Sequence, residues 1–159
     1  MRHIFLIFIG LFLSLIPAHA YHFRSYQVED GLSHNSVWAV MQDSRGFMWF
    51  GTNDGLNRFD GKKFKIFRRV QGDSLSIGNN FIHCLKEDSR GRFLIGTKQG
   101  LYLFDERQEK FEHIDLNRDQ KDDASINAIM EDPSGNIWLA CHGYGLYVLT
   151  PELTVKKHY

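Results

Sequence analysis

The sequence has no excess of charge of either sign, since 19 lysine and arginine residues balance 19 aspartate and glutamate residues. Without a basic surplus to neutralise phosphates, binding to nucleic acid is not expected. Proline is scarce, at 3 residues in 159, while aromatic residues make up 14% of the chain. Disordered chains show the opposite bias, so we expect an ordered, globular protein of about one domain.

Long hydrophobic runs are also lacking, apart from one stretch between Ile4 and Ile16. Its thirteen residues fall short of the ~20 that a membrane-spanning helix needs. Arg2 precedes the stretch, and the small residues Ala18 and Ala20 follow it. This order is typical of a secretory signal peptide. We predict a signal peptide over residues 1–20 and an exported mature chain that begins at Tyr21; an uncleaved membrane anchor is the alternative.

Cysteine is rare as well, with only Cys84 and Cys141 in the chain. An exported protein can form disulfides, but neither cysteine belongs to a C-x-x-C pair, and the two lie at non-equivalent positions of the repeat described below. Two small buried thiols are therefore expected, with pairing left open. The eight histidines show no metal-binding spacing. We expect no metal and no cofactor.

What the chain does contain is an internal repeat. An Asp-x-x-Gly motif recurs at spacings of 45 and 44 residues, and a short apolar run and then a Gly-Leu step follow each copy. Recurrence of several features in register indicates a repeat architecture. The three motifs are Asp43–Gly46, Asp88–Gly91 and Asp132–Gly135, and the Gly-Leu steps are Gly55-Leu56, Gly100-Leu101 and Gly145-Leu146.

Each copy has the pattern of a four-stranded meander. An alternating stretch precedes each Asp and predicts a strand with one buried face. Asp-x-x-Gly suits the tight turn that follows, since Asp bonds the nearby backbone and Gly accepts a positive φ. The apolar run forms the second strand, and two further strands complete the unit. The expected first strands are 37–42, 82–87 and 126–131; the third are 56–60, 101–105 and 146–150; the fourth are 64–67, 111–114 and 155–159.

Four strands in each repeat of roughly 40–45 residues are the signature of a β-propeller blade. The predicted fold is all-β, with blades over residues 31–70, 71–115 and 116–159. Residues 21–30 are assigned to a closing outer strand and its lead-in, because Phe23–Tyr26 has the shape of a fourth strand without the first three. Since closed propellers have roughly four to eight blades, the chain is expected to be a piece of a longer protein; assembly of several copies is the alternative.

The first copy, from Asn35 to Leu56, resembles the two-component regulator propeller repeat nearly position for position. The second departs from it with Leu94 in place of Trp, and the third with Ala140-Cys141 in place of Gly-Thr and with one extra residue before its Gly-Leu step. The resemblance implies the N-terminal periplasmic sensor part of a hybrid two-component regulator, whose full-length protein is anchored in the inner membrane. The expected partners are an oligosaccharide ligand, further propeller blades and a histidine kinase part, with a possible homodimer.

Two groups of conspicuous residues have structural explanations. Trp49 and Trp138 occupy equivalent second-strand positions, so we expect them to lie in the core between blades. Trp38 is not repeated, because His83 and Asn127 stand at its equivalent positions, and core or channel lining is the preferred interpretation. The three motif aspartates are expected to serve their turns and not to form a catalytic set.

The ligand is expected on one face of the propeller. In a blade, the loop between the second and third strands and the loop that leads to the next blade share a face, and binding residues gather on such loops. The groups there suit a hydroxyl-rich ligand. The predicted ligand-binding residues are Asn53, Asp54, Lys98, Gln99, His142 and Tyr144.

The sequence therefore favours a non-catalytic, oligosaccharide-sensing propeller fragment. Two alternatives stay open: an exported propeller enzyme that acts on glycans, and a structural scaffold that docks other proteins. An enzyme would need an acid and a base without repeat equivalents on the loop face. Only Asp54 and His142 loosely meet that condition, on different blades.

Overall fold

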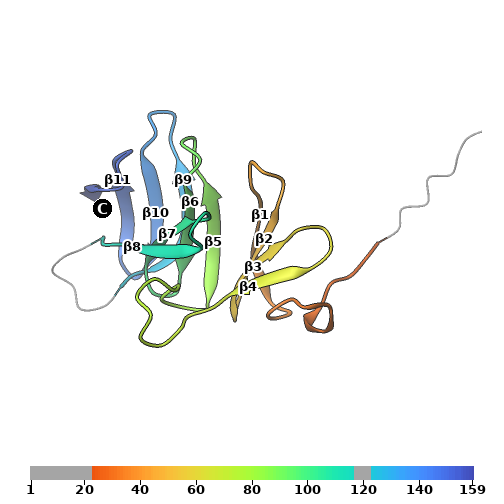
Figure 1. Cartoon of the computed structure of the whole chain (residues 1–159). Coiled ribbons are helices and arrows are strands. Elements are labelled where there is room, and N and C mark those ends of the chain that lie inside the picture. The colour runs from red at the N-terminus through yellow and green to blue at the C-terminus, as the bar shows by residue number, and fades with distance from the viewer. Residues whose placement is uncertain (1–22, 117–122) are drawn as a thin grey trace, which may run out of the picture.

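The computed structural model describes residues 23–116 and 123–159. It contains a short 3-10 helix, η1 (Val28–Asp30), and three antiparallel sheets of four strands each, which stand side by side (Figure 1). The all-β propeller-blade fold is therefore confirmed. The first sheet holds β1 (Val37–Gln42), β2 (Met48–Thr52), β3 (Gly55–Phe59) and β4 (Phe64–Phe67); the second holds β5 (Ile82–Glu87), β6 (Phe93–Thr97), β7 (Leu101–Asp105) and β8 (Lys110–Ile114); the third holds β9 (Ser125–Glu131), β10 (Ile137–His142), β11 (Gly145–Leu149) and β12 (Val155–His158).

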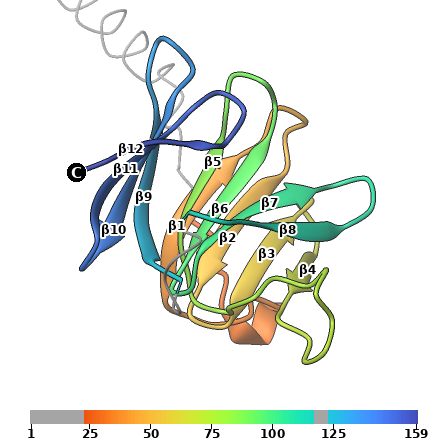
Figure 2. The same cartoon turned by 90° about the vertical axis from the view of Figure 1, so that its left-hand side faces the viewer.

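Each sheet is a simple meander in which successive strands pair, in the orders β1-β2-β3-β4, β5-β6-β7-β8 and β9-β10-β11-β12. The strands lie within one residue or so of the expected ranges. The Asp-x-x-Gly turns join the first and second strands, and their glycines have φ values of 91°, 73° and 79°. Such values favour glycine over residues with a side chain. Figure 2 shows the same sheets from the side.

The first strands lie on the inside of the array, because β1 contacts β5 and β5 contacts β9 across the gaps between sheets. Two apolar clusters fill those gaps. One joins the first sheet to the second and contains the fully buried Trp49 and Ile95; the other joins the second sheet to the third and contains Leu94 and Leu139. The expected position of Trp49 in the core is confirmed, and its indole N–H donates to Asp43 Oδ2 at 2.8 Å.

The third sheet has no neighbour on its outer side among the described residues. Equivalent leucines show the consequence: Leu56 and Leu101 are 0% exposed, whereas Leu146 is 43% exposed. Trp138 also lies on that side, where it is half-buried and stacks on Tyr159 at 6.3 Å between ring centroids. The outer side of the third sheet is thus equivalent to the sides of the first and second sheets, which the next blade covers within this chain.

Polar contacts between neighbouring sheets repeat at the rim that carries the Asp-x-x-Gly turns. Ser44 donates to Glu87 through its backbone N–H at 2.7 Å and its hydroxyl at 2.6 Å. Ser89 makes the same pair of contacts to Glu131, and the arginines that follow the two serines pair with Glu106 and Glu152. In the third turn, Pro133 and Ser134 replace the Ser-Arg dipeptide. Pro133 has neither the backbone N–H nor the hydroxyl that Ser44 and Ser89 donate.

The segment before the first sheet does not form a strand in the described residues. Residues 23–27 lack strand pairing, and Tyr26 packs edge-on against Phe59 and Phe64 at 5.0 and 5.7 Å between centroids. The closing-strand hypothesis stays a prediction, since its partner would come from another part of the ring. The predicted signal peptide, residues 1–20, lies outside the described residues.

Candidate functional site

Every first strand contains a β-bulge at the same position. Between Val37 and Ala39 the pairing of β1 with β2 skips one residue, and that residue is Trp38. The same skip leaves His83 unpaired in β5 and Asn127 unpaired in β9. A bulge redirects a side chain away from the regular alternation and often lies next to a functional site.

The three bulge residues form a continuous row across the sheets. The Trp38 ring lies 6.4 Å from the His83 ring, and Phe81 packs between them at 5.5 and 4.6 Å from the two. His83 Nδ1 lies 3.0 Å from Asn127 Oδ1. We call Trp38, Phe81, His83 and Asn127 the bulge row. It brings side chains from all three repeats to one surface.

Hydrogen bonds fix both ends of the bulge row. The Trp38 indole N–H donates to Asn53 Oδ1 at 2.5 Å, and the Ser125 hydroxyl donates to Asn127 Oδ1 at 3.3 Å. An amide oxygen can only accept. His83 Nδ1 therefore donates in the contact with Asn127, and His83 Nε2 is left to bond to another molecule.

The chemistry of the bulge row suits a ligand with apolar faces and many hydroxyl groups. Trp38 is 60% exposed, an unusual state for the largest side chain. Its ring offers a flat apolar surface, while the imidazole and the Asn127 amide offer hydrogen-bond donors and acceptors. Sugar rings have C–H faces that pack on aromatic rings and hydroxyls that bond to such groups. None of the row residues carries a carboxylate, so the row itself supplies no acid and base pair.

The six predicted ligand-binding residues divide into three places. Asn53 joins the bulge row through its bond to Trp38. Asp54 is engaged elsewhere, because it pairs with Arg68 at 3.0 Å and accepts from Asn80 Nδ2 at 3.1 Å. These bonds hold the β2–β3 turn against the loop that leads to the second blade. Asp54 thus has a role in positioning that loop.

Lys98 and Gln99 form the corresponding turn of the second blade. The Lys98 backbone N–H donates to the Phe81 carbonyl at 3.0 Å, which places this turn beside the bulge row, and its side chain is exposed. Gln99 Oε1 accepts from Asn79 Nδ2 at 2.7 Å. Both turns therefore meet the loop between blades, as the predicted shared face requires.

His142 is the last residue of β10, and Tyr144 lies on the turn that follows. His142 is exposed and pairs with Ser125 in the ladder, near the Asn127 end of the bulge row. Tyr144 is half-buried and packs against the apolar cluster between the second and third sheets, while its carbonyl accepts from His158 Nε2 at 2.6 Å. Its ring therefore contributes to packing, which the sequence interpretation of a freely placed loop residue did not include.

Sequence reasoning missed the bulge row as a site, although it noticed that Trp38, His83 and Asn127 are equivalent and different. That difference was the available signal. Positions that pack between blades repeat, as Leu56, Leu101 and Leu146 do, whereas the bulge positions carry three unlike polar or aromatic side chains. An equivalent position without a repeated residue is where a distinct recognition surface can be built.

The other reactive groups have structural surroundings. Both cysteines are free thiols. Burial raises the pKa of Cys84 to about 12 and that of Cys141 to about 11, so both remain protonated near neutral pH and are poor nucleophiles. Within residues 23–116 and 123–159, no group of three or more His, Cys, Asp or Glu side chains could hold a metal ion. Across the same residues, no helix has the length and hydrophobicity needed to cross a membrane.

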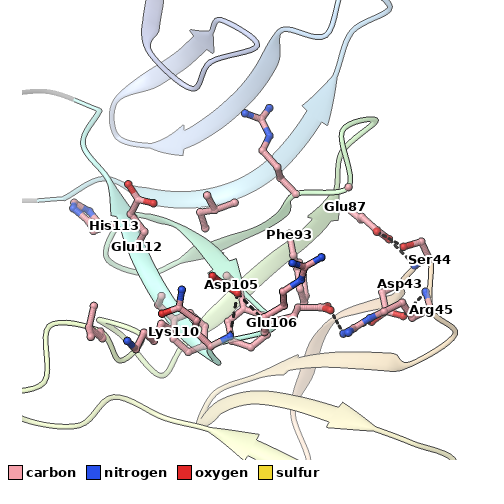
Figure 3. Close-up of a pocket in the computed structure, with 18 of the residues that line it drawn as sticks. Asp43, Ser44, Arg45, Glu87, Phe93, Asp105, Glu106, Lys110, Glu112 and His113 are labelled. Atoms are coloured by element: carbon pink, nitrogen blue, oxygen red, sulfur yellow. Dashed lines mark hydrogen bonds and ion pairs between the residues drawn. The ribbon is translucent and has the colours of Figure 1, made fainter.

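A cavity lies on the opposite rim, between the first and second sheets. It measures about 910 Å³ and is bordered by the Asp43–Arg45 turn and by the β7–β8 hairpin (Figure 3). Part of its polar lining already bridges the two blades, because Ser44 donates to Glu87 and Arg45 pairs with Glu106. The cavity therefore lies along a seam between two blades, which these two contacts hold together.

Comparisons with known proteins identify the repeat. Residues 31–54, 76–99 and 120–143 match the two-component regulator propeller family. The chain therefore carries three two-component regulator propeller repeats, as the sequence motif predicted.

Two solved structures share the arrangement of blades. The fold matches the extracellular domain of the hybrid two-component system BT3049 from B. thetaiotaomicron with a TM-score of 0.78 and 26% identity, over 88% of this chain and 20% of that chain. The corresponding domain of BT4673 gives 0.67 and 25%, over 79% and 19%. The chain thus spans about a fifth of the length of these extracellular domains.

A curated relative also matches part of the sequence. Over 55 residues the chain is 53% identical to histidine kinase P4 of Formosa agariphila, which is 35% of this chain and 4% of that protein. The kinase is far longer than the matched segment. The described part of this chain shows no catalytic site of its own.

Proposed function

We propose that this chain, which carries three two-component regulator propeller repeats, is part of the extracellular sensor of a hybrid two-component regulator and that it binds an oligosaccharide on the bulge row. The similarity to two extracellular sensor domains and to a histidine kinase supports the first half of the proposal. In this proposal the domain lies in the periplasm, and the kinase activity belongs to another part of the full-length protein.

The observation that carries the binding proposal is the repeated bulge with unrepeated side chains. Blade cores must repeat in order to pack, but recognition of a ligand needs different groups around one site. The structure places Trp38, His83 and Asn127 at the same backbone position of three blades, joined by ring contacts and a hydrogen bond. The same backbone bulge in each blade thus presents a different side chain on one surface.

The shape and charge of the bulge row favour a neutral, extended saccharide. The row crosses three sheets, so it can contact more than one sugar unit. It combines an exposed indole with imidazole and amide groups and has no fixed charge, which fits hydroxyl groups better than phosphate or ammonium groups. Interface hot spots are enriched in Trp residues of this kind, so Trp38 is expected to provide the largest share of the binding energy.

The proposal can be tested by removing the Trp38 ring in the complete extracellular domain. A saccharide that binds the wild-type domain is first selected from a glycan array, and its affinity is then measured by titration calorimetry. Trp38→Ala is expected to lower affinity by about 1–3 kcal/mol, or roughly 5- to 150-fold, because a central aromatic anchor is lost. The melting temperature is expected to change little, since the ring is largely exposed.

Lys62→Ala provides the control, because Lys62 is an exposed residue of the first sheet in the β3–β4 turn, at the rim away from the bulge row. It is expected to leave affinity unchanged. If Trp38→Ala binds with wild-type affinity, or if both variants lose binding equally, the bulge row is not the binding site.

A further inference from the structure

A second cavity lies on the same face, over the second blade. It measures about 530 Å³ and is enclosed by the loop between β4 and β5 on one side and by β7, β8 and the β6–β7 turn on the other. Gln99, one of the predicted ligand-binding residues, lines it. The other polar side chains around it come from Arg69, Asp73, Ser74, Ser76, Tyr102, His113 and Asp123.

The wall of this cavity is fixed before any ligand arrives. The Ser76 hydroxyl donates to the Asp73 carbonyl at 2.9 Å and accepts the Val70 N–H at 2.9 Å. Asp73 Oδ1 accepts the Leu75 N–H at 2.9 Å, and Ile77 is fully buried in the core below. Preformed walls of this kind reduce the entropy that a ligand must overcome on binding.

Tyr102 places an unpartnered hydroxyl at the base of the cavity. The residue is only 7% exposed, and its ring packs in the core between the first and second sheets. Its hydroxyl makes no hydrogen bond to any residue that the structure describes, and Tyr102 lines the cavity. Burial raises the pKa of this phenol, so the group stays a hydroxyl that can both donate and accept.

Gly78 lies directly beside this hydroxyl. A Cβ atom at this position would lie 1.9 Å from the Tyr102 oxygen, and Gly78 lacks the positive φ that would otherwise explain a glycine. The glycine is thus required for space and not for backbone conformation. Any larger residue here would collide with the hydroxyl that borders the cavity.

Charged side chains of both signs border the cavity. The Arg69 guanidinium forms no ion pair within the described part of the chain, and His113 Nε2 lies 3.2 Å from Asp123 Oδ1. Asp73 adds a second carboxylate. Together these side chains offer donors and acceptors to adjacent hydroxyl groups.

We propose that this cavity is a second saccharide-binding subsite, which takes one neutral sugar unit through a hydroxyl bonded to the Tyr102 oxygen and to the Arg69 guanidinium. Its volume falls within the range of roughly 300–1,000 Å³ that is usual for small-molecule sites. The choice of a saccharide as the ligand rests on the proposed function. The cavity and the unpartnered hydroxyl are observed in the structure and do not depend on that function.

The test uses the complete extracellular domain and five named probes: the methyl glycosides of glucose, galactose, mannose and xylose, and methyl glucuronoside as the anionic comparison. Each probe is soaked into crystals and titrated in solution by NMR. At least one neutral glycoside is expected in the cavity with a hydroxyl on the Tyr102 oxygen. Tyr102→Phe is expected to weaken its binding by roughly 3- to 10-fold, the effect of one lost hydrogen bond.

Tyr147→Phe is the matched control, because Tyr147 is the equivalent residue of the third blade, is also buried, and its ring contacts His158 as the Tyr102 ring contacts His113. It is expected to leave the affinity unchanged. Arg69→Gln is a second variant whose folding is not at risk, since Arg69 is exposed, and it too is expected to weaken binding several-fold.

The proposal is overturned if none of the neutral glycosides occupies the cavity, if methyl glucuronoside binds there more tightly than all of them, or if Tyr102→Phe or Arg69→Gln binds as wild type does. Trp38→Ala separates this result from the proposed function. Loss of saccharide binding in Trp38→Ala with an empty cavity would keep the bulge row and remove only the second subsite. A glycoside bound in the cavity, together with unchanged saccharide binding in Trp38→Ala, would keep the second subsite and remove the bulge row as the binding site.

Discussion

Residues of this repeat fall into two groups: those that pack in the core between blades, and those on the surface that differ from one copy to the next. Trp49 is fully buried and bonded to Asp43, whereas Trp38 lies on the surface and contacts the next blade through aromatic rings. Both are tryptophans near the start of the same sheet, so residue type alone does not tell them apart. Position within the repeat does, because the third copy has a tryptophan at the position of Trp49, whereas neither other copy has one at the position of Trp38.

The Asp-x-x-Gly aspartates give a residue-scale prediction about pH. Asp132 accepts hydrogen bonds from the Asn136 amide, from the Trp138 indole and from two backbone N–H groups. The Asn136 amide and then the indole lower its pKa from 3.8 to about 2. Because the folded pKa is the lower one, Asp132 stabilises the fold above about pH 4 and loses that contribution as pH falls towards 2.

Asp132→Asn removes the titrating group and keeps an acceptor. Urea midpoints of the extracellular domain are measured between pH 5 and pH 2 for both proteins. The difference in stability between wild type and variant is expected to shrink as the pH falls through this window. A difference that stays constant across it would show that the turn does not depend on the charge of Asp132.

At the scale of elements, close approach between blades depends on a small residue in the second strand. A Cβ atom at Gly51 would lie 2.7 Å from Ile82 Cγ2 of the second sheet, and one at Gly96 would lie 2.9 Å from Ile126 Cγ2 of the third sheet. The third copy has Ala140 at this position, on the side without a neighbouring sheet. The departure of the third copy from the Gly-Thr pattern thus falls where the chain itself makes no blade interface.

Gly51→Ala is therefore expected to destabilise the domain by about 1–3 kcal/mol through overpacking against Ile82. Elsewhere in a strand the same substitution would be neutral or stabilising, because alanine loses less backbone entropy on folding. Urea unfolding of the extracellular domain measures the effect, and a double variant with Ile82→Val should recover part of it. An unchanged or increased stability for Gly51→Ala would contradict this close-packing account.

The elements were largely predictable from the sequence, and the site was not. Alternation before each Asp and the Gly-Leu steps located strands such as Leu101–Asp105, because one buried face and a turn leave few choices. The bulges at Trp38 and His83 could not be predicted, since each lies at the second residue of its strand, where too few residues precede it to show a shift in the alternation. The partners of Asp54 and Tyr144 depend on contacts between distant loops, which a single sequence does not specify.

At the scale of the whole molecule, the described residues form an arc with one open side. Leu146, Met130 and Val155 are exposed on the third sheet, and Val37 and Val40 are exposed on the first strand of the opposite end. Surfaces of this kind mark interaction sites or aggregation hazards. The repeat contacts within the chain indicate that further blades would cover them in the longer protein.

An isolated protein of residues 21–159 is accordingly expected to self-associate or aggregate at micromolar concentration. Light scattering coupled to size exclusion measures its mass. Leu146→Lys combined with Met130→Lys should reduce the association, because both residues lie on the open side of the third sheet. A monodisperse monomer with a cooperative unfolding transition would show that three blades are stable without the rest of the ring.

The central claim is that the bulge row across the three blades is the recognition surface. The most direct measurement is a crystal structure of the complete extracellular domain with a bound saccharide from the glycan array. We predict a sugar ring packed on Trp38, with hydroxyl groups on His83 Nε2 or on the Asn127 amide. A saccharide bound instead at the opposite rim, beside the Asp43–Gly46 turn, with an unoccupied bulge row would contradict the account.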